Sequence, residues 1–396
     1  MFSSRTKWLL DQNRFTLALD AHRRAGKELL DVTISNPTEC GVSYPENEIL
    51  EALSDPRTLA YIPESKGLRE ARESVVSYYD GRMGFAGPGP SVDPERIILT
   101  SGTSEGYSHI FRLLCDVGDE ILVPAPSYPL FEFLADLADI QLVPYPLFYD
   151  DGWGIDFASL REALSPRSRA VLVVHPNNPT GSFVKPLEAA VLAEICAKHE
   201  MAIVADEVFL DYADEFQNAD VARTFALHGA ALTFTLSGLS KISLLPQMKL
   251  AWMIVSGPPG LVQTAVARLE IIADTYLSPS TPVQLALPKF LALRIDLQAQ
   301  LKQRISANLA FLDAILRESK LLVRLDREGG WYAILRVPVT GPDESLAVEL
   351  LERCSVLVHP GHFFNFSRDG FLVLSLITPE VQFQEGVRRL RKFFDG

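Results

Sequence analysis

The chain has 396 residues, of which 47% are hydrophobic and 22% are charged, and its formal net charge is -13. This acidic balance argues against a nucleic-acid-binding face, because phosphate binding requires a basic stripe. The sequence contains no apolar run of about 18 residues and opens too polar for a signal peptide. We therefore expect a globular protein of about two domains, located in the cytoplasm, with neither a nucleic acid nor a membrane as partner.

The four cysteines are scattered and form no CxxC pair. This spacing indicates neither a disulfide framework nor a metal site. Cys115, Cys196 and Cys354 each lie in an apolar run, so we expect them to be buried free thiols.

The N-terminal region predicts a small set of elements in chain order. An amphipathic helix is expected over 5–26, a strand over 29–34 and a turn over 35–38. The Gly- and Pro-rich segment 84–90 predicts an exposed loop.

From about residue 46 to 290, short apolar runs alternate with helical patterns. Strands are expected at 97–100, 120–124, 140–144, 170–174, 202–205, 232–236 and 250–255. Helices are expected between them, at 67–79, 105–115, 186–199 and 260–273. Because these strands are apolar nearly throughout, both faces of their sheet must be covered. The pattern predicts an α/β fold with a mostly parallel, seven-stranded sheet between helices.

After about residue 285 the strands become fewer and alternate more. A long helix over 282–319 leads into strands at 322–325, 329–335, 356–359 and 372–376, with helices at 344–354 and 380–394. We expect a large α/β domain over 46–285. Residues 1–45 and 286–396 are expected to form a smaller α+β domain, on which the N-terminal arm packs.

Lys241 follows an apolar run in the sequence Ser-Gly-Leu-Ser-Lys. A lysine among apolar groups loses solvation of its charged form, so its pKa falls and it becomes a nucleophile toward an aldehyde. Taken alone, a surface lysine after a strand is the better explanation of this pattern. The other strand ends decide between the two interpretations, because ligands of an open parallel sheet lie beyond the carboxyl ends of its strands.

Two strand ends offer phosphate-binding and ring-binding groups. Gly102, Thr103 and Ser104 open a helix, where free N–H groups and the helix dipole favour a phosphate. An ordinary hydroxyl N-cap is the alternative for this segment. Tyr128 stands at the end of the next strand, where it could stack on a planar ring or belong to the core.

Two further strand ends carry an amide and an acid. Asn178 lies in the rigid loop His-Pro-Asn-Asn-Pro-Thr-Gly over 175–181, and its amide can donate to an oxygen. Asp206 ends a buried strand, where a carboxylate is costly unless it is paired with a cation. A protonated pyridine nitrogen would be such a partner.

These groups are the ones that pyridoxal 5′-phosphate (PLP) requires. On these motifs, and on Asn-Pro-Thr at 36–38 and the segment 61–69, the chain resembles the fold-type I PLP-dependent enzymes over almost its whole length. Within that group it resembles the class I and II aminotransferases. The resemblance implies the PLP-dependent transferase fold for the large domain. It also implies an aminotransferase that acts on amino acids and 2-oxo acids.

The resemblance assigns roles to individual residues of this chain. Lys241 would form the internal aldimine with PLP and then shuttle the proton, and Asp206 would keep the pyridinium protonated. Asn178 would donate to O3′ of the ring and Tyr128 would stack on it. Four residues would hold the phosphate: Gly102, Thr103, Ser104 and Lys249. Tyr61 matches a tyrosine that reaches the phosphate from the neighbouring subunit, so a homodimer is implied.

The sequence departs from the family pattern at four positions. Lys249 stands where the family usually has an arginine, and Phe209 stands where it usually has a tyrosine. Gly238 stands where many relatives have a serine, and Ser237 is the suggested substitute for that serine. Val373 occupies the place of the arginine that binds the substrate α-carboxylate. Arg368, His362 and Arg5 are candidate replacements. The aromatic segment 359–366 is expected to line the substrate side.

The missing arginine leaves two other functions open. One is a PLP-dependent lyase or decarboxylase, because a scaffold does not fix the reaction. The other is a non-catalytic PLP-binding sensor, which the retention of Lys241, Asp206 and Asn178 together disfavours.

Overall fold

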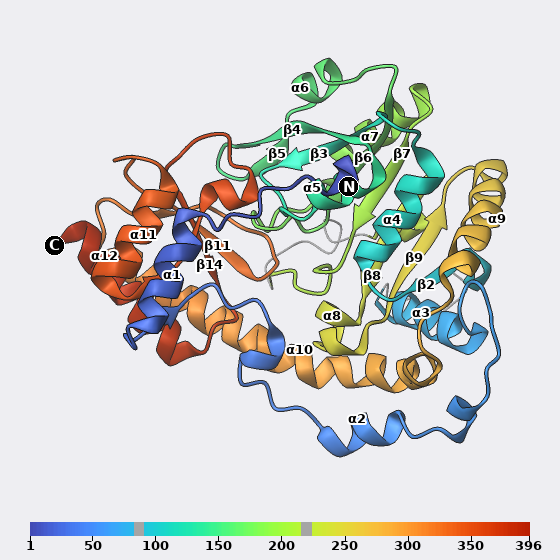
Figure 1. The fold of residues 1–396 in the computed structure, drawn as a ribbon, viewed down its shortest axis with the longest axis horizontal. Coiled ribbons are helices and arrows are strands. Elements are labelled where there is room, and N and C mark those ends of the chain that lie inside the picture. The colour runs from blue at the N-terminus through green and yellow to red at the C-terminus, as the bar shows by residue number, and fades with distance from the viewer. Residues whose placement is uncertain (83–90, 215–223) are drawn as a thin grey trace.

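The computed structural model describes residues 1–82, 91–214 and 224–396. The loop predicted at 84–90 lies outside these ranges. Figure 1 shows a large, mostly parallel sheet with helices on both sides, and a smaller sheet with its own helices next to it.

The large sheet contains eight strands, in the order β2-β9-β8-β7-β6-β3-β4-β5. Strands β8, β7, β6, β3 and β4 are parallel, whereas β9 and β5 run antiparallel to their neighbours. All seven predicted strands are present, and β5 is the one that the sequence missed, because it is only a short hairpin extension of β4. The bounds are β2 Ile97–Thr100, β3 Glu120–Ala125, β4 Gln141–Tyr149, β5 Trp153–Ile155, β6 Ser168–Val174, β7 Ala202–Asp206, β8 Thr233–Gly238 and β9 Ala251–Ser256.

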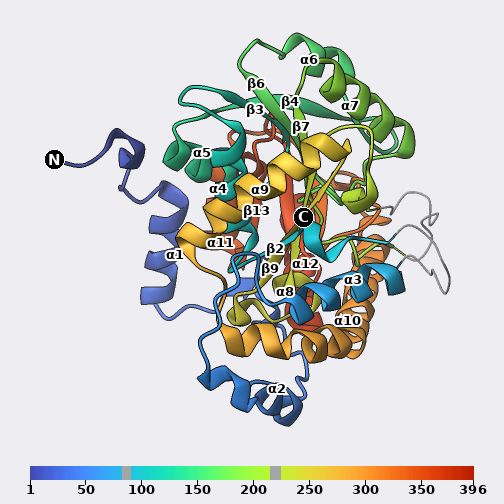
Figure 2. The same ribbon diagram turned by 90° about the vertical axis from the view of Figure 1, so that its right-hand side faces the viewer.

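Both faces of this sheet are buried, as the apolar strands predicted. In β6, Leu172 packs into the cluster under one set of helices, and Val171 and Val173 pack into the cluster on the other face. One set comprises α4 (Thr103–Leu114), α5 (Phe131–Ala138) and α9 (Pro259–Tyr276). The opposite face packs against α3 (Arg69–Arg82), α6 (Phe157–Glu162), α7 (Pro186–Lys198), α8 (Leu239–Ile242) and the start of α10 (Thr281–Leu316). Figure 2 shows α9 and α3 on their separate sides of the strands.

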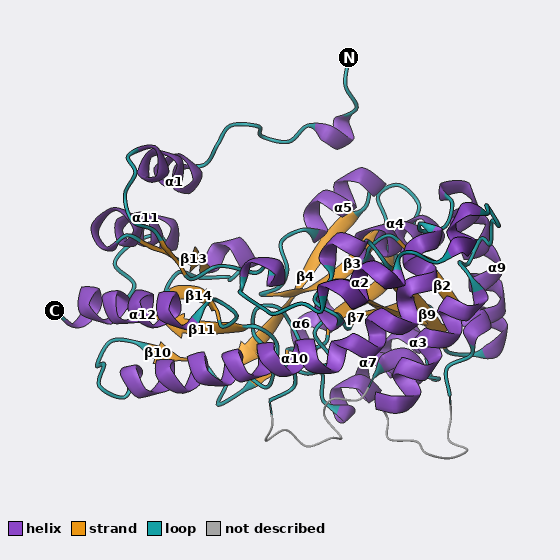
Figure 3. Cartoon of the chain, turned by 90° about the horizontal axis from the view of Figure 1, so that it is seen from below, coloured by secondary structure: helices purple, strands orange, loops and turns teal. Residues whose placement is uncertain are grey.

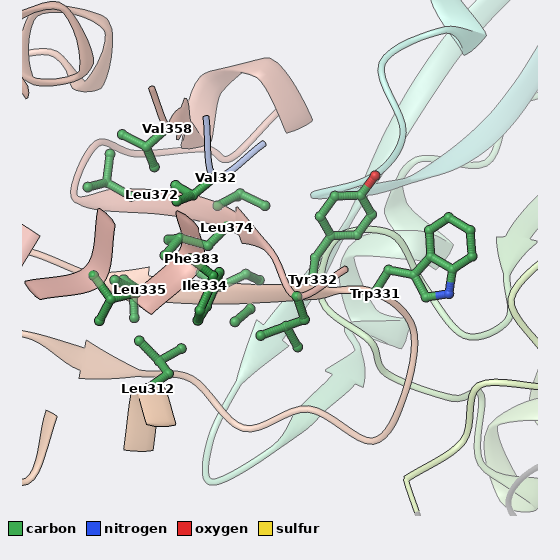
Figure 4. Packing of buried hydrophobic residues seen from close by; sticks show 14 of the residues in the cluster. Val32, Leu312, Trp331, Tyr332, Ile334, Leu335, Val358, Leu372, Leu374 and Phe383 are labelled. Atoms are coloured by element: carbon green, nitrogen blue, oxygen red, sulfur yellow. The ribbon is translucent and has the colours of Figure 1, made fainter. Parts of the chain in front are cut away.

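The smaller part is built on a four-stranded antiparallel sheet in the order β10-β11-β14-β13. A parallel pair, β1-β12, ties the N-terminal segment to it. Figure 4 shows the core of this part, where Leu335, Leu372 and Leu374 meet Val32 and Phe383. The bounds are β1 Leu30–Asp31, β10 Val323–Arg324, β11 Tyr332–Arg336, β12 Val356–Leu357, β13 His359–Pro360, β14 Phe371–Ser375, α1 Arg14–Arg24, α11 Asp343–Cys354 and α12 Glu380–Asp395. Helix α2 (Glu46–Ala52) instead packs with α3 and α10 against the large sheet.

The helix predicted over 5–26 is wrong in its first half. Helix α1 begins only at Arg14, because Asn13 caps it by accepting a hydrogen bond from the Thr16 amide at 2.8 Å. The residues before it form an arm, drawn extended in Figure 3, that reaches α5. Trp8 donates to Asp136 at 2.8 Å and packs edge-on against Phe133 there. The arm therefore contacts the large sheet's helices, while α1 packs on the smaller part as predicted.

The predictions on the burial of the cysteines are confirmed for one residue and wrong for two. All four cysteines are free thiols, but Cys115 and Cys354 are only half-buried, contrary to expectation, and Cys196 is buried. Among the helices of the described ranges, none combines the length and the apolar character that a membrane crossing needs. Short 3₁₀ helices lie at Ser4–Thr6, Pro37–Glu39, Pro56–Leu59, Pro94–Arg96, Phe225–Leu227, Pro246–Met248 and Gly361–Phe364.

Candidate active site

Lys241 lies on the short helix α8, directly after β8. The turn between them is tight: a Cβ atom on Gly238 would lie 2.7 Å from Cβ of Ala251 on β9. A serine, which many relatives have here, would require the two strands to separate. The main chain of Lys241 is held in place by Tyr212, whose hydroxyl donates to its carbonyl at 2.7 Å. Glycine at position 238 is therefore explained by packing.

The Lys241 side chain ends in an aromatic enclosure. Its Nζ lies 4.6 Å from the ring centre of Trp331 and 5.7 Å from that of Phe209. The nearest acceptor is the Ser35 carbonyl at 3.5 Å. Burial lowers the pKa of Lys241 to about 8, although the charge of Asp206 acts in the opposite direction. The amine therefore has a substantial neutral, nucleophilic fraction near neutral pH.

Asp206 lies at the carboxyl end of β7 and is buried. Its carboxylate accepts hydrogen bonds from the Tyr107 hydroxyl at 2.8 Å and from the Val208 amide at 3.1 Å. Burial raises the pKa of Asp206, and the charge of Lys241 opposes this effect. Within the described ranges no ion pair reaches this carboxylate, so the charge awaits a cation. A protonated ring nitrogen fits that requirement.

The N-terminus of α4 has no side-chain cap and has free space next to it, as a phosphate-binding site requires. Gly102 caps this helix in an extended conformation without any side-chain hydrogen bond, and a Cβ atom there would meet nothing within 4 Å. Thr103 and Ser104 begin the helix. One turn later Tyr107 reaches Asp206, so a single helix carries the candidate phosphate cradle and the partner of the acid.

Tyr128 and Asn178 lie on neighbouring loops. The Tyr128 ring packs edge-on against Phe131 at 5.9 Å, and burial and the charge of Asp206 raise the pKa of its hydroxyl. Asn178 is buried, and its Oδ1 has no hydrogen-bond partner in the structure. A buried amide with a free acceptor indicates a place for a ligand. The group thus fits PLP.

Two predicted phosphate ligands, Lys249 and Tyr61, have exposed side chains in the single chain. Lys249 is exposed and adopts a left-handed conformation with φ of 52°. Tyr61 is 75% exposed. Ser237, the suggested substitute for a serine at 238, instead directs its hydroxyl to the Glu207 carbonyl at 3.3 Å.

The aromatic segment 359–366 lies against this site, as expected. Phe364 packs against Tyr332 at 6.1 Å, and its carbonyl accepts the Ser127 amide at 2.9 Å, next to Tyr128. Figure 4 shows Trp331 and Tyr332 pointing away from the small core toward the green part of the chain. No pattern in the sequence indicated a role for these two rings. It could have indicated Tyr107, which lies four residues after Thr103 on the same helix.

The three proposed replacements for the missing arginine do not reach Lys241 by any contact in the described structure. Arg5 pairs with Asp139 at the end of α5. The Arg368 guanidinium lies over the Phe371 ring at 5.6 Å, and His362 packs edge-on against Phe363 at 4.7 Å.

Comparison with known proteins adds evidence of a different kind. The sequence model for "Aminotransferase class I and II" matches residues 28–390. The glutamate-pyruvate aminotransferase AlaA of Escherichia coli K12 is 30% identical over 266 residues, which cover 66% of this chain and 63% of that protein. The alignment thus spans less than two thirds of AlaA. An alanine aminotransferase of Mycobacterium bovis is 27% identical, covering 93% of this chain and 86% of that protein.

Solved structures share the fold. An alanine aminotransferase from Pyrococcus furiosus superposes with a TM-score of 0.86 and 23% identity, covering 100% of both chains. An aspartate aminotransferase from Thermotoga maritima gives a TM-score of 0.81 at 21% identity, again covering 100% of both chains.

Proposed function

Because the chain belongs to the class I and II aminotransferase family, we propose that it is a PLP-dependent aminotransferase, which moves an amino group between an amino acid and a 2-oxo acid. Members of this family use PLP. The observation that supports the proposal most strongly is that one site contains both the desolvated amine of Lys241 and the buried carboxylate of Asp206, which forms no ion pair in the described structure. When bound, PLP supplies an aldehyde for the amine and a ring that accepts electrons.

The residues of this chain would divide the work as follows. Lys241 would hold the cofactor and would move a proton at the substrate Cα. Asp206 holds the proton on the ring nitrogen, and Asn178 donates to the ring oxygen. Gly102, Thr103 and Ser104 bind the phosphate at the N-terminus of α4.

Tyr128 would stack on the ring of the cofactor. The aromatic rings around Lys241 would exclude water from the reacting atoms, because Trp331 is fully buried and Phe209 nearly so.

The decisive experiment replaces the nucleophile. Lys241→Ala should abolish the visible absorbance that PLP gives with the wild-type protein and lower the transamination rate by at least about 10³-fold. Lys320→Ala, on the exposed surface, is the control and should change neither. Retained turnover in Lys241→Ala would contradict the proposal. The names of the relatives favour transamination over a lyase or decarboxylase reaction, and product analysis separates these reactions.

We further propose that two copies of the chain form a homodimer, in which Lys249 and the partner copy's tyrosine at position 61 complete the phosphate site. The strong exposure of Tyr61, with its neighbours Ile62 at 64% and Leu59 at 92%, supports a covered surface there. Sedimentation of the wild type and of Tyr61→Asp tests this proposal. The domain division at residues 45/46 and 285/286 and the cytoplasmic location stay predictions of the sequence.

A further inference from the structure

Position 373, where the resemblance to the class I and II aminotransferases implies an arginine that binds the substrate carboxylate, is apolar in this chain. Val373 is fully buried on β14, where it lies between Ile334 of β11 and His359 of β13. Directly opposed residues of neighbouring strands project to the same face of a sheet, and side chains alternate along each strand. Val373 therefore shares its face with Ser375 and with Tyr332, which contacts the enclosure around Lys241.

The face that carries Val373 meets the substrate side at two points. Tyr332 packs against Phe209 at 6.4 Å, and Phe209 lies beside the Lys241 amine. The Ser375 hydroxyl donates to the Ile34 carbonyl, one residue before Ser35, whose carbonyl is the nearest acceptor to that amine. A long cationic side chain at position 373 would lie on the same face of the sheet as these contacts, which lead to the Lys241 amine. The valine side chain has no polar atom there.

Three buried or half-buried arginines of the described chain contact groups other than Lys241. Arg327 is buried, but its guanidinium pairs with Asp214 at 3.1 Å and donates to the Gly330 carbonyl at 2.8 Å. Arg304 donates to the Cys40 carbonyl, and Arg324 pairs with Asp313 at 2.6 Å. Among the described residues, Lys241 is the cation that lies over the Trp331 and Phe209 rings.

We propose that this site selects its amino-group substrates by an apolar or aromatic substituent and not by an α-carboxylate. Primary amines without a carboxylate are therefore substrates alongside apolar amino acids. This inference rests on the proposed aminotransferase function and deepens it.

The reaction of such an amine balances without a further reactant. The C–N bond of R–CH₂–NH₂ breaks and its carbon is oxidised by two electrons to the aldehyde R–CHO. The keto carbon of the 2-oxo acid is reduced by the same two electrons and gains the amino group. Water consumed in releasing the aldehyde is returned when the 2-oxo acid condenses.

The test compares matched pairs on the PLP-loaded wild-type protein. L-phenylalanine is paired with phenethylamine, and L-leucine with isopentylamine, and the loss of the visible absorbance band gives the efficiency of each half-reaction. We expect amine-to-acid efficiency ratios above about 0.1, whereas a carboxylate held by charge-assisted bonds would give ratios well below this value. Ratios below about 0.1 for both pairs overturn the inference and leave the aminotransferase function intact.

A binding measurement gives a readout that needs no turnover. Hydrocinnamate and its uncharged isostere hydrocinnamamide are titrated into the protein, and Trp331, beside Lys241, reports through tryptophan fluorescence. The inference expects dissociation constants within about threefold of each other, and a preference for the acid above about tenfold contradicts it. If none of the amino compounds reacts, the proposed function fails, and this comparison still decides how the pocket treats a carboxylate.

A variant introduces a positive charge at position 373. Val373→Arg should shift both the amine-to-acid ratio and the binding preference toward the acid by about 10- to 100-fold. Val339→Arg adds the same charge at a position that is 67% exposed and should shift neither. An unchanged preference in a folded Val373→Arg protein would count against the inference. If circular dichroism shows that this variant does not fold, the wild-type comparisons decide.

Discussion

The Tyr107 hydroxyl donates a hydrogen bond to the Asp206 carboxylate at 2.8 Å, with both groups buried. This bond joins the helix that begins with the phosphate cradle to the strand that ends with the acid. It satisfies one carboxylate oxygen and leaves the charge itself without a cation. The chain therefore bears the electrostatic cost of a group that is useful only when a positively charged ligand arrives.

Asp206→Asn should stabilise the cofactor-free protein at neutral pH by about 1–2 kcal/mol, because it removes a buried charge that serves function and not folding. The asparagine can keep both contacts, accepting from the Val208 amide and donating to the Tyr107 oxygen. Thermal unfolding of the cofactor-free proteins measures the change, and the same variant should transaminate at least about 10²-fold more slowly.

The stability difference should depend on pH in a defined direction. Burial raises the pKa of Asp206 above its ordinary value of 3.8. The contribution of this group to stability is then fully present below 3.8 and is lost as the pH rises through the raised folded-state pKa. The advantage of Asp206→Asn should accordingly shrink toward zero in acid. A constant advantage at all pH values would show that the charge is not its cause.

The rate at which the cofactor-free protein captures PLP should rise with pH and level off near 8, because burial lowers the pKa of the Lys241 amine to about 8. Below that value the neutral fraction falls about tenfold per pH unit. Stopped-flow absorbance gives the profile, and a solvent-exposed lysine in a peptide serves as the control. A rate that keeps rising toward pH 10.5, the ordinary lysine pKa, would contradict the desolvated environment.

Phe209→Tyr should lower the pKa of the visible chromophore of the PLP-loaded protein by about one unit or more, because an added hydroxyl donor near the ring oxygen stabilises the deprotonated form. Phe209 packs on Trp331 at 5.2 Å, and its ring lies 5.7 Å from the Lys241 amine, so a hydroxyl there lies at the site. Absorbance titration gives the value. Phe209→Leu is the control without a hydroxyl, and an equal shift in both variants would refute the explanation.

Gly238→Ser should destabilise the protein by about 1–3 kcal/mol, as expected for overpacking, since a Cβ atom at this position lies 2.7 Å from the Ala251 Cβ. Chemical denaturation measures the loss. Gly229→Ser is the matched control, because a Cβ atom there meets nothing within 4 Å. Equal stability of the two variants would mean that β8 and β9 can separate at no cost.

The local sequence predicted the large sheet well, for a physical reason that particular residues illustrate. The strands of the large sheet are buried on both faces, so their apolar runs are unbroken and easily recognised, as at 170–174. Polar residues directly after such runs, such as Asp206, stand out for the same reason. The short strand β5 and the start of α1 were missed, because a three-residue hairpin and a cap at Asn13 leave little trace in the periodicity.

By itself, the sequence determined the α/β architecture, and it predicted a nucleophile at 241, an acid at 206 and the order of the groups suited to PLP, because each depends on residues that are contiguous in the chain. Only the tertiary structure decided which rings enclose the amine and which partner holds the acid. Trp331 lies 90 residues after Lys241, and Tyr107 lies 99 residues before Asp206. Their contacts depend on how the small sheet packs on the large one and on how α4 crosses β7, and no local pattern encodes either arrangement.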